Sequence, residues 1–158
     1  MKIKIYAIGK IKDNYLKEGI NNYLKKINNY ANIEIIEVQD EPIKNIKESE
    51  IEIAKNIECK RILKLLKDNE YLIGLDLNKK QFTSEEFASY LNNKFILGGS
   101  NISFVIGGSY GLSNELKCRC NDFITLSKMT FLHTMTRLIL LEQIYRAFKI
   151  NNNEVYHK

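Results

Sequence analysis

Three glycines in the segment SFVIGGSYGLSNELKC, residues 103–118, follow an apolar run that is typical of a β-strand. Backbone without side chains can approach a nucleotide closely, so Gly107, Gly108 and Gly111 form a candidate ligand-binding turn. The order GGSYG is neither the dinucleotide fingerprint GxGxxG nor a phosphate loop, because no GK[ST] follows it. The plain alternative is a tight turn that needs a positive φ angle.

A second segment, KMTFLHTMTR at residues 128–137, follows another expected strand and enters a long helix. Both turns lie at the carboxyl ends of their strands, which meet at one edge of a parallel sheet. Leu75, in the expected strand YLIGLDL, lies near that edge as well. Three strand ends at one cleft predict a pocket for an adenosine-sized ligand.

Few other side chains suggest chemistry. His133 lies four residues before Arg137 at the start of the last expected helix, where it is expected to cap or pack. Cys118 and Cys120 form a CxC pair without further ligand spacing, so no metal site is expected. With Cys59 they make an odd number of cysteines, which we interpret as reduced thiols. Asp76 and Glu115 are the acids nearest the cleft, with no assigned role.

The pattern of the whole chain predicts how these residues are positioned. Strands are expected at 2–9, 33–38, 71–77, 103–108 and 123–127, and helices at 13–29, 43–67, from a capping box at 83–86, from about 114, and at 130–150. Strands that alternate with helices predict an α/β fold with a mostly parallel sheet and helices on both faces. The length of 158 residues favours a single domain, 1–158.

Charge and hydropathy narrow the function classes. The apolar runs are too short for a membrane span and the N-terminus does not resemble a signal peptide, so we expect a soluble, cytoplasmic protein without a membrane partner. From residue 117 onward the sequence contains seven Lys/Arg and three acidic residues, so +4 of the net charge of +5 lies there. A basic C-terminal third favours an anionic partner, nucleic acid before membrane, although a solvated lysine-rich surface is the plain alternative.

Several motifs, taken in their order along the chain, are similar to those of a known protein family. GLDL, FVIGGSYGL, LSKMTF, HTMTR and EQIYRAFKI, with the ending YHK, resemble the ribosomal large-subunit methyltransferase H family, small SPOUT-class pseudouridine N3-methyltransferases. The similarity extends over essentially the whole chain. It implies a trefoil-type α/β knot in the C-terminal part, a homodimer, and S-adenosylmethionine as cofactor. The implied reaction is methylation of N3 of a pseudouridine in helix 69 of 23S rRNA, on the assembled ribosome.

The resemblance also implies roles for individual residues. Cofactor contacts carried over are Leu75, Gly107, Leu126, Ser127, Lys128, Met129, Thr130 and Phe131. His157 is the candidate proton acceptor, and Tyr156 and Lys158 beside it are further candidate catalytic residues, expected to position the base or contact phosphate. Arg137 and Lys158 are the candidate RNA contacts. A frayed terminus is the alternative for His157. Leu132 stands where the family usually has proline, which is a departure at the cofactor loop.

Two alternatives remain at this point. One is a ribosome- or RNA-binding module that binds the cofactor without transferring the methyl group. The other is an unrelated nucleotide enzyme such as an NAD-dependent oxidoreductase, which the missing early fingerprint disfavours. For Gly107 we expect that a valine side chain would fill space needed by a ligand and leave a folded dimer that no longer binds cofactor.

Overall fold

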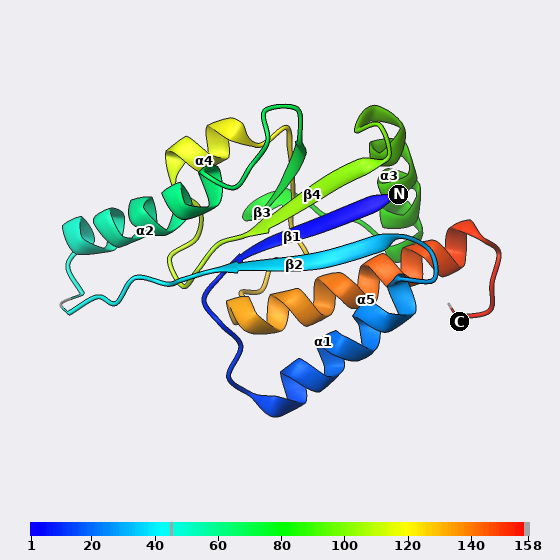
Figure 1. The fold of residues 1–158 in the computed structure, drawn as a ribbon, viewed down its shortest axis with the longest axis horizontal. Coiled ribbons are helices and arrows are strands. Elements are labelled where there is room, and N and C mark those ends of the chain that lie inside the picture. Colours follow the sequence, from blue (N-terminus) through cyan, green and yellow to red (C-terminus); the bar gives the residue numbers. More distant parts are fainter. Residues whose placement is uncertain (45, 157–158) are drawn as a thin grey trace.

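The computed structural model describes residues 1–44 and 46–156. The elements follow in the order β1 (Lys2–Ile8), α1 (Asn14–Ile27), β2 (Asn32–Val38), α2 (Glu48–Leu63), β3 (Tyr71–Lys80), α3 (Ser84–Leu97), β4 (Asn101–Ile106), α4 (Asn114–Arg119), β5 (Asp122–Ile124) and α5 (His133–Asn151) (Figure 1). The strands form one parallel sheet in the order β2-β1-β4-β3-β5.

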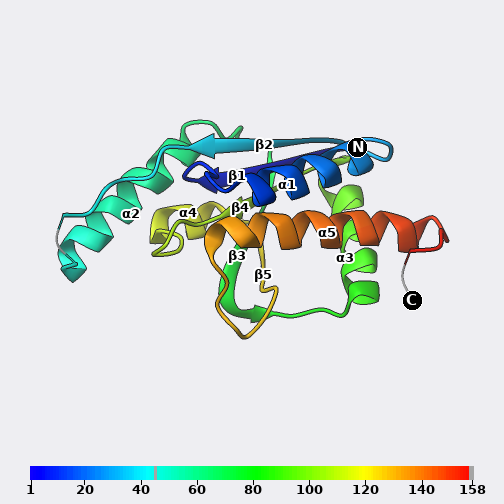
Figure 2. The same cartoon turned by 90° about the horizontal axis from the view of Figure 1, so that it is seen from below.

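The helices cover both faces of the sheet (Figures 1 and 2). Alternate residues of β1 point to opposite sides: Ile3 and Ile5 join the core beneath α1, α3 and α5, whereas Tyr6 and Ile8 join the core beneath α2 and α4. Burial on both faces is what a central parallel strand requires. The predicted fold class, a mostly parallel α/β sheet with helices on both faces, is confirmed.

Strand β3 is longer than expected and bends at its end. The segment NKKQ was expected as a turn, but the strand continues to Lys80, which pairs with Ile124 after a register shift from Leu75. Asn78 absorbs the irregularity with a φ of 58°, a left-handed conformation that asparagine tolerates better than most residues. The bend leaves residues 75–77 at the edge where the strands end.

Caps define two of the predicted helix starts. Thr83 Oγ1 accepts a hydrogen bond from Glu86 N at 3.2 Å, and Glu86 Oε2 accepts one from Thr83 N at 2.8 Å, so the predicted capping box is confirmed. Ser113 caps α4 as predicted, because its Oγ accepts from Leu116 N at 3.3 Å.

Two other helices begin later than expected. Helix α2 begins at Glu48 instead of residue 43, and its first turn carries Glu48 and Glu50, which favour a helix N-terminus. Helix α5 begins at His133 instead of residue 130, because Leu132 is extended, with φ −56° and ψ 132°. The segment between β5 and α5 is therefore a loop and is free to form a wall of the site.

Candidate functional site

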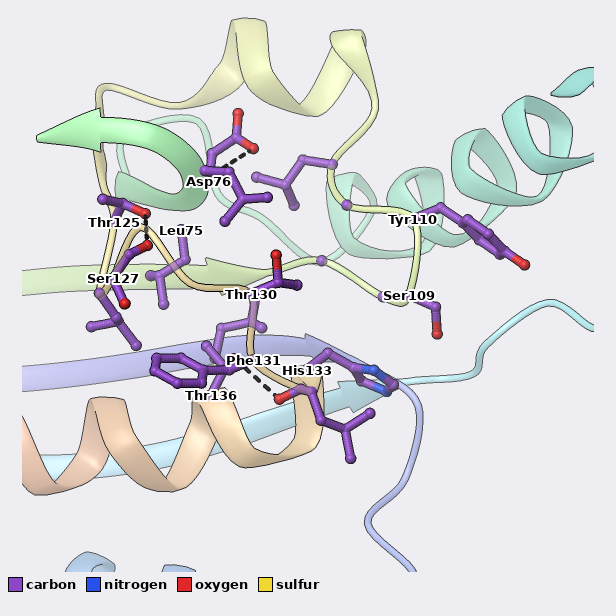
Figure 3. Close-up of a pocket in the computed structure, with 18 of the residues that line it drawn as sticks. Leu75, Asp76, Ser109, Tyr110, Thr125, Ser127, Thr130, Phe131, His133 and Thr136 are labelled. Carbon is purple, nitrogen blue, oxygen red and sulfur yellow. Dashed lines mark hydrogen bonds between the residues drawn. The ribbon is translucent and has the colours of Figure 1, made fainter.

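A cavity of about 660 Å³ lies at the carboxyl ends of β3, β4 and β5 (Figure 3). Its walls come from three segments that are distant in the sequence: residues 75–77 at the end of β3, 106–112 after β4, and most of 125–133 after β5. Lys55 of α2, Lys117 of α4 and Thr136 of α5 complete the lining. The three strand ends thus meet at one pocket, as the sequence predicts.

The glycine turn forms one wall through close backbone contacts. Gly111 N donates to Gly108 O at 3.1 Å, and Gly111 has a φ of 81°, the positive angle expected of such a turn. A Cβ atom at Gly107 would lie 2.6 Å from Gly111 C and 2.7 Å from Gly111 O. The cause expected for the effect of Gly107→Val is therefore wrong: the side chain would collide with the turn itself, so the loop would be distorted before any ligand space was filled.

Side chains of helix α2 contact the glycine turn and hold it in place. Cys59 Sγ accepts a hydrogen bond from Ser113 N at 3.2 Å, and the Glu58 carboxylate packs close to Gly108. Glu58 is 6% exposed, and its Oε1 accepts from Glu41 N at 2.9 Å. Burial raises the pKa of Glu58 above its ordinary value, with the hydrogen bond from Glu41 opposing. The cysteines are free thiols in the structure, as predicted.

The loop after β5 is held by its own polar groups. Thr125 Oγ1 donates to Ser127 O at 3.3 Å (Figure 3), and Ser127 Oγ accepts from Met129 N at 3.0 Å. These bonds turn the chain so that apolar side chains reach the rim, where Met129 is 73% exposed. Leu132, at the position of the family's usual proline, is also on this rim and is exposed.

Seven of the eight residues predicted to contact a cofactor line the cavity. They are Leu75, Gly107, Leu126, Ser127, Met129, Thr130 and Phe131, whereas Lys128 is outside the lining. Their role as cofactor contacts stays a prediction. The lining also includes Tyr110, Lys117 and Asp76, for which no role was predicted from the sequence. Lys117 could have been anticipated because α4 follows directly after the glycine turn.

His133 lies at the mouth of the cavity, on the first turn of α5 (Figure 3). Burial lowers the pKa of its imidazole; Arg137 lowers it further, and Asp40 opposes. The ring is therefore neutral at pH 7. From the sequence, His133 was expected only to cap or pack, but it lies in the cavity wall.

Arg137 requires a correction. It was predicted to contact RNA, but its side chain is 0% exposed. Its Nη1 donates to Glu37 Oε1 at 2.7 Å, and its Nη2 donates to Ile8 O at 2.6 Å and Gly9 O at 2.8 Å. Because the guanidinium holds the end of β1 against α5, it is not available to bind a phosphate in this arrangement.

The C-terminal tail packs on α5, away from the cavity. The Tyr156 ring meets the Tyr145 ring edge-on at a centroid distance of 4.9 Å, and the Arg146 guanidinium lies 4.8 Å from its centroid. Hydrogen bonding to Tyr23, 3.5 Å away, and burial raise the pKa of Tyr156 to about 12, so its hydroxyl is protonated at neutral pH. His157 and Lys158, the other predicted catalytic residues, lie outside the described residues.

The basic C-terminal third uses much of its charge internally. Ion pairs join Lys117 to Asp76, Arg137 to Glu37, Arg146 to Glu142 and Lys149 to Glu154. Arg119 donates to the carbonyl oxygens of residues 67, 68 and 70. The charge count therefore overstates the cationic surface that this part of the chain offers to a partner.

Within residues 1–44 and 46–156, two kinds of feature are absent. Across these ranges the His, Cys, Asp and Glu side chains form no group of three that could hold a metal ion. Nor, in the same part of the chain, is any helix long and apolar enough to cross a membrane.

Comparison with known proteins gives consistent matches along the chain. A family model described as "Predicted SPOUT methyltransferase" matches residues 1–157. Two proteins named "Ribosomal RNA large subunit methyltransferase H", from Bacillus cytotoxicus and Bacillus thuringiensis, are 49% and 48% identical over 159 residues and are covered, like this chain, to 100%. A solved structure, a probable methylase family protein from Haemophilus influenzae, has a TM-score of 0.52 at 16% identity over 96% of this chain and 66% of its own. That last likeness concerns the fold alone.

Proposed function

This chain belongs to the SPOUT methyltransferase family, and from that premise we propose that it methylates the RNA of the large ribosomal subunit. The names of the Bacillus relatives support this substrate class. The proposed donor is S-adenosylmethionine, and the proposed acceptor is N3 of a pseudouridine in helix 69 of 23S rRNA on the assembled, cytoplasmic ribosome. The observation that carries the proposal is the cavity formed where three strand ends meet.

The cavity suits an adenosine-containing cofactor in size and lining. Its volume of about 660 Å³ falls within the range of roughly 300–1,000 Å³ that is typical of small-molecule sites. Leu75, Leu126 and Phe131 offer apolar surface for an aromatic base, and the glycine turn offers backbone groups without side chains. We propose that these residues hold the adenosine part.

The chain's own residues have two tasks in the proposed reaction. Bound S-adenosylmethionine would supply a strongly electrophilic methyl group, so orienting the acceptor nitrogen is the first task. The exposed apolar rim, which includes Met129 and Leu132, is proposed to exclude water around it. The second task is to accept the imide proton of N3, which we assign to His157, since an imidazole with a pKa of about 6.5 can accept it near neutral pH.

The proposed role of the tail requires a second copy of the chain. Tyr156 packs beside Tyr145 and Arg146, near the C-terminal end of α5, whereas the cavity lies at His133, where α5 begins. The 12 residues from His133 to Tyr145 correspond to about 18 Å of helix. We therefore propose a homodimer in which Tyr156, His157 and Lys158 act at the partner's cavity; the trefoil knot implied by the resemblance belongs to this proposal.

Methyl transfer to ribosomes tests the function. The protein is incubated with S-adenosylmethionine carrying a labelled methyl group and with ribosomes that lack the N3 methyl in helix 69, and the labelled nucleoside is identified after digestion. Label on N3-methylpseudouridine is the expected result. Intact cofactor binding without label would instead favour the binding module, and absence of cofactor binding would refute the proposal.

Removal of residues 156–158 tests the tail. We expect cofactor affinity to be kept and methyl transfer to be lost. Val155→Ala serves as the control, because this side chain is 84% exposed, directly precedes the deleted residues and has no proposed role. Mixing tail-deleted chains with Gly107→Val chains should restore part of the activity if the tail serves the partner's cavity. Failure of the mixture, with mixed dimers demonstrated, would place the tail elsewhere.

A further inference from the structure

An oppositely charged pair stands in the wall of the cavity, between the end of β3 and α4. We propose that Asp76 and Lys117 bind the amino-acid end of the cofactor, Asp76 contacting its α-ammonium group and Lys117 its α-carboxylate. This inference rests on the proposed function, since it names the recognition of one part of the proposed cofactor.

The pair is held so that both groups are available to a ligand. Lys117 Nζ lies 2.9 Å from Asp76 Oδ2, and the two side chains are 37% and 19% exposed. Asp76 Oδ1 accepts a hydrogen bond from Leu77 N at 3.0 Å, which fixes the carboxylate at the bend of β3. The carboxylate is thus oriented by the backbone, and Oδ2 shares its remaining capacity between Lys117 and a ligand.

The composition of the cavity lining indicates that the ammonium group of the cofactor is bound by Asp76. Among the described residues that line the cavity, Asp76 is the only carboxylate. S-adenosylmethionine carries an ammonium and a carboxylate on one carbon atom, so its binding brings a cation and an anion into the same cavity. A desolvated ammonium needs an anionic partner, and Asp76 is the one this lining offers.

The choice of Lys117 for the carboxylate follows from its neighbours. Lys55 also lines the cavity, but its Nζ is bound to Glu52 Oε2 at 2.6 Å on its own helix. Lys117 faces Asp76, so a zwitterion placed against the pair meets each charge with its opposite. Both side chains of this pair stay partly exposed, 37% for Lys117 and 19% for Asp76, so a ligand in the cavity can reach them. The position of the pair in the cavity wall therefore points to a ligand.

The contribution of the amino-acid end to binding is measured by comparing two thioether ligands, one with this group and one without it. S-adenosylhomocysteine carries the homocysteine group, whereas 5′-methylthioadenosine has only a methyl group on the same sulfur. Calorimetric titration of both ligands is made with the wild-type protein, Asp76→Asn and Lys117→Met. Two surface substitutions outside the lining, Glu115→Gln on α4 and Lys79→Met on β3, remove the same charges elsewhere and serve as matched controls.

The expected result is selective. Asp76→Asn and Lys117→Met should each weaken S-adenosylhomocysteine about tenfold, as for the loss of one charged contact, and leave methylthioadenosine unchanged. Equal weakening of both ligands, or unchanged binding of both, would overturn the assignment while leaving the proposed function intact. Absence of binding of either thioether and of S-adenosylmethionine to the wild-type protein would overturn both. Thermal unfolding of each variant verifies that it is folded.

Discussion

Replacement of Arg137 should destabilise the fold even though arginine is ordinarily a surface residue. The buried guanidinium makes three hydrogen bonds of 2.6–2.8 Å, to Glu37 and to the carbonyl oxygens of Ile8 and Gly9. Arg137→Met removes all three hydrogen bonds and replaces the arginine with an unbranched apolar side chain of similar length. The two carbonyl oxygens lose charged donors, whereas Glu37, with 32% of its side chain exposed, can be solvated again.

The expected loss follows from these partners. A charged hydrogen bond contributes about 1.5–3 kcal/mol, so losing the two bonds to the buried carbonyl oxygens costs about 3–6 kcal/mol, and burial of the apolar methionine side chain offsets a small part of that loss. We expect Arg137→Met to lower the free energy of unfolding by about 3–5 kcal/mol. For a chain of this size each kcal/mol corresponds to about 2–4 °C, so the melting temperature should fall by roughly 6–20 °C.

Urea unfolding and RNA binding together test this reasoning. Arg137→Lys keeps the charge but has no fork that reaches all three acceptors, so we expect an intermediate loss of stability. At a temperature where the variant is folded, its affinity for RNA and the salt dependence of that affinity should match the wild type. Unfolding of Arg137→Met at wild-type urea concentrations would refute the structural role. A salt slope reduced by about one would return Arg137 to the RNA interface.

Two further predictions concern the glycine turn and its support. Gly107→Ala should cost about 1–3 kcal/mol of stability and weaken cofactor binding, because its Cβ would lie 2.6 Å from Gly111 C. Gly99→Ala is the control: Gly99 has a φ of 60° and open space around it, so this change should cost about 1–2 kcal/mol of stability and leave cofactor binding unchanged. Equal cofactor affinities of the two variants, measured by calorimetry, would contradict the role of the turn. Since burial raises the pKa of Glu58 in the folded state, its contribution to stability is full below the ordinary value and is lost as pH rises through the raised one. The unfolding free energy of the wild type should therefore fall with rising pH relative to Glu58→Gln, and parallel urea profiles from pH 4 to 8 would exclude this.

Local patterns allowed much of the fold to be predicted. The capping box at Thr83 and the cap at Ser113 act over three residues, so the sequence contains all that is needed to recognise them. Alternating apolar residues likewise identified strand β1, whose two faces are buried under different helices. The extension of β3 was missed because it depends on pairing between Lys80 and Ile124, two residues that are 44 positions apart in the sequence.

The site was predictable in its location but not in its polar contacts. Parallel strands end at one edge, which was enough to bring Leu75 and Gly107 together. The burial of Arg137 was not foreseeable, since its partner Glu37 lies 100 residues earlier in the chain. The charges of the C-terminal third were overestimated for the same reason. Lys117 pairs with the distant acid Asp76, and a count of charged residues cannot reveal such a pair. The knot, the dimer and the roles of the tail residues remain predictions.

The position of β1 within the sheet has a consequence for how the chain is made. β1 pairs with β2, which begins 30 residues later, but its other edge pairs with β4, which begins only at Asn101. While the chain emerges from the ribosome, about two-thirds of it must be synthesised before that edge can close. Until then the row of unpaired backbone groups beside Ile3 and Ile5 is open to other strands, a hazard for association. Slow, late closure of the sheet is therefore expected, and the cavity can form only after it.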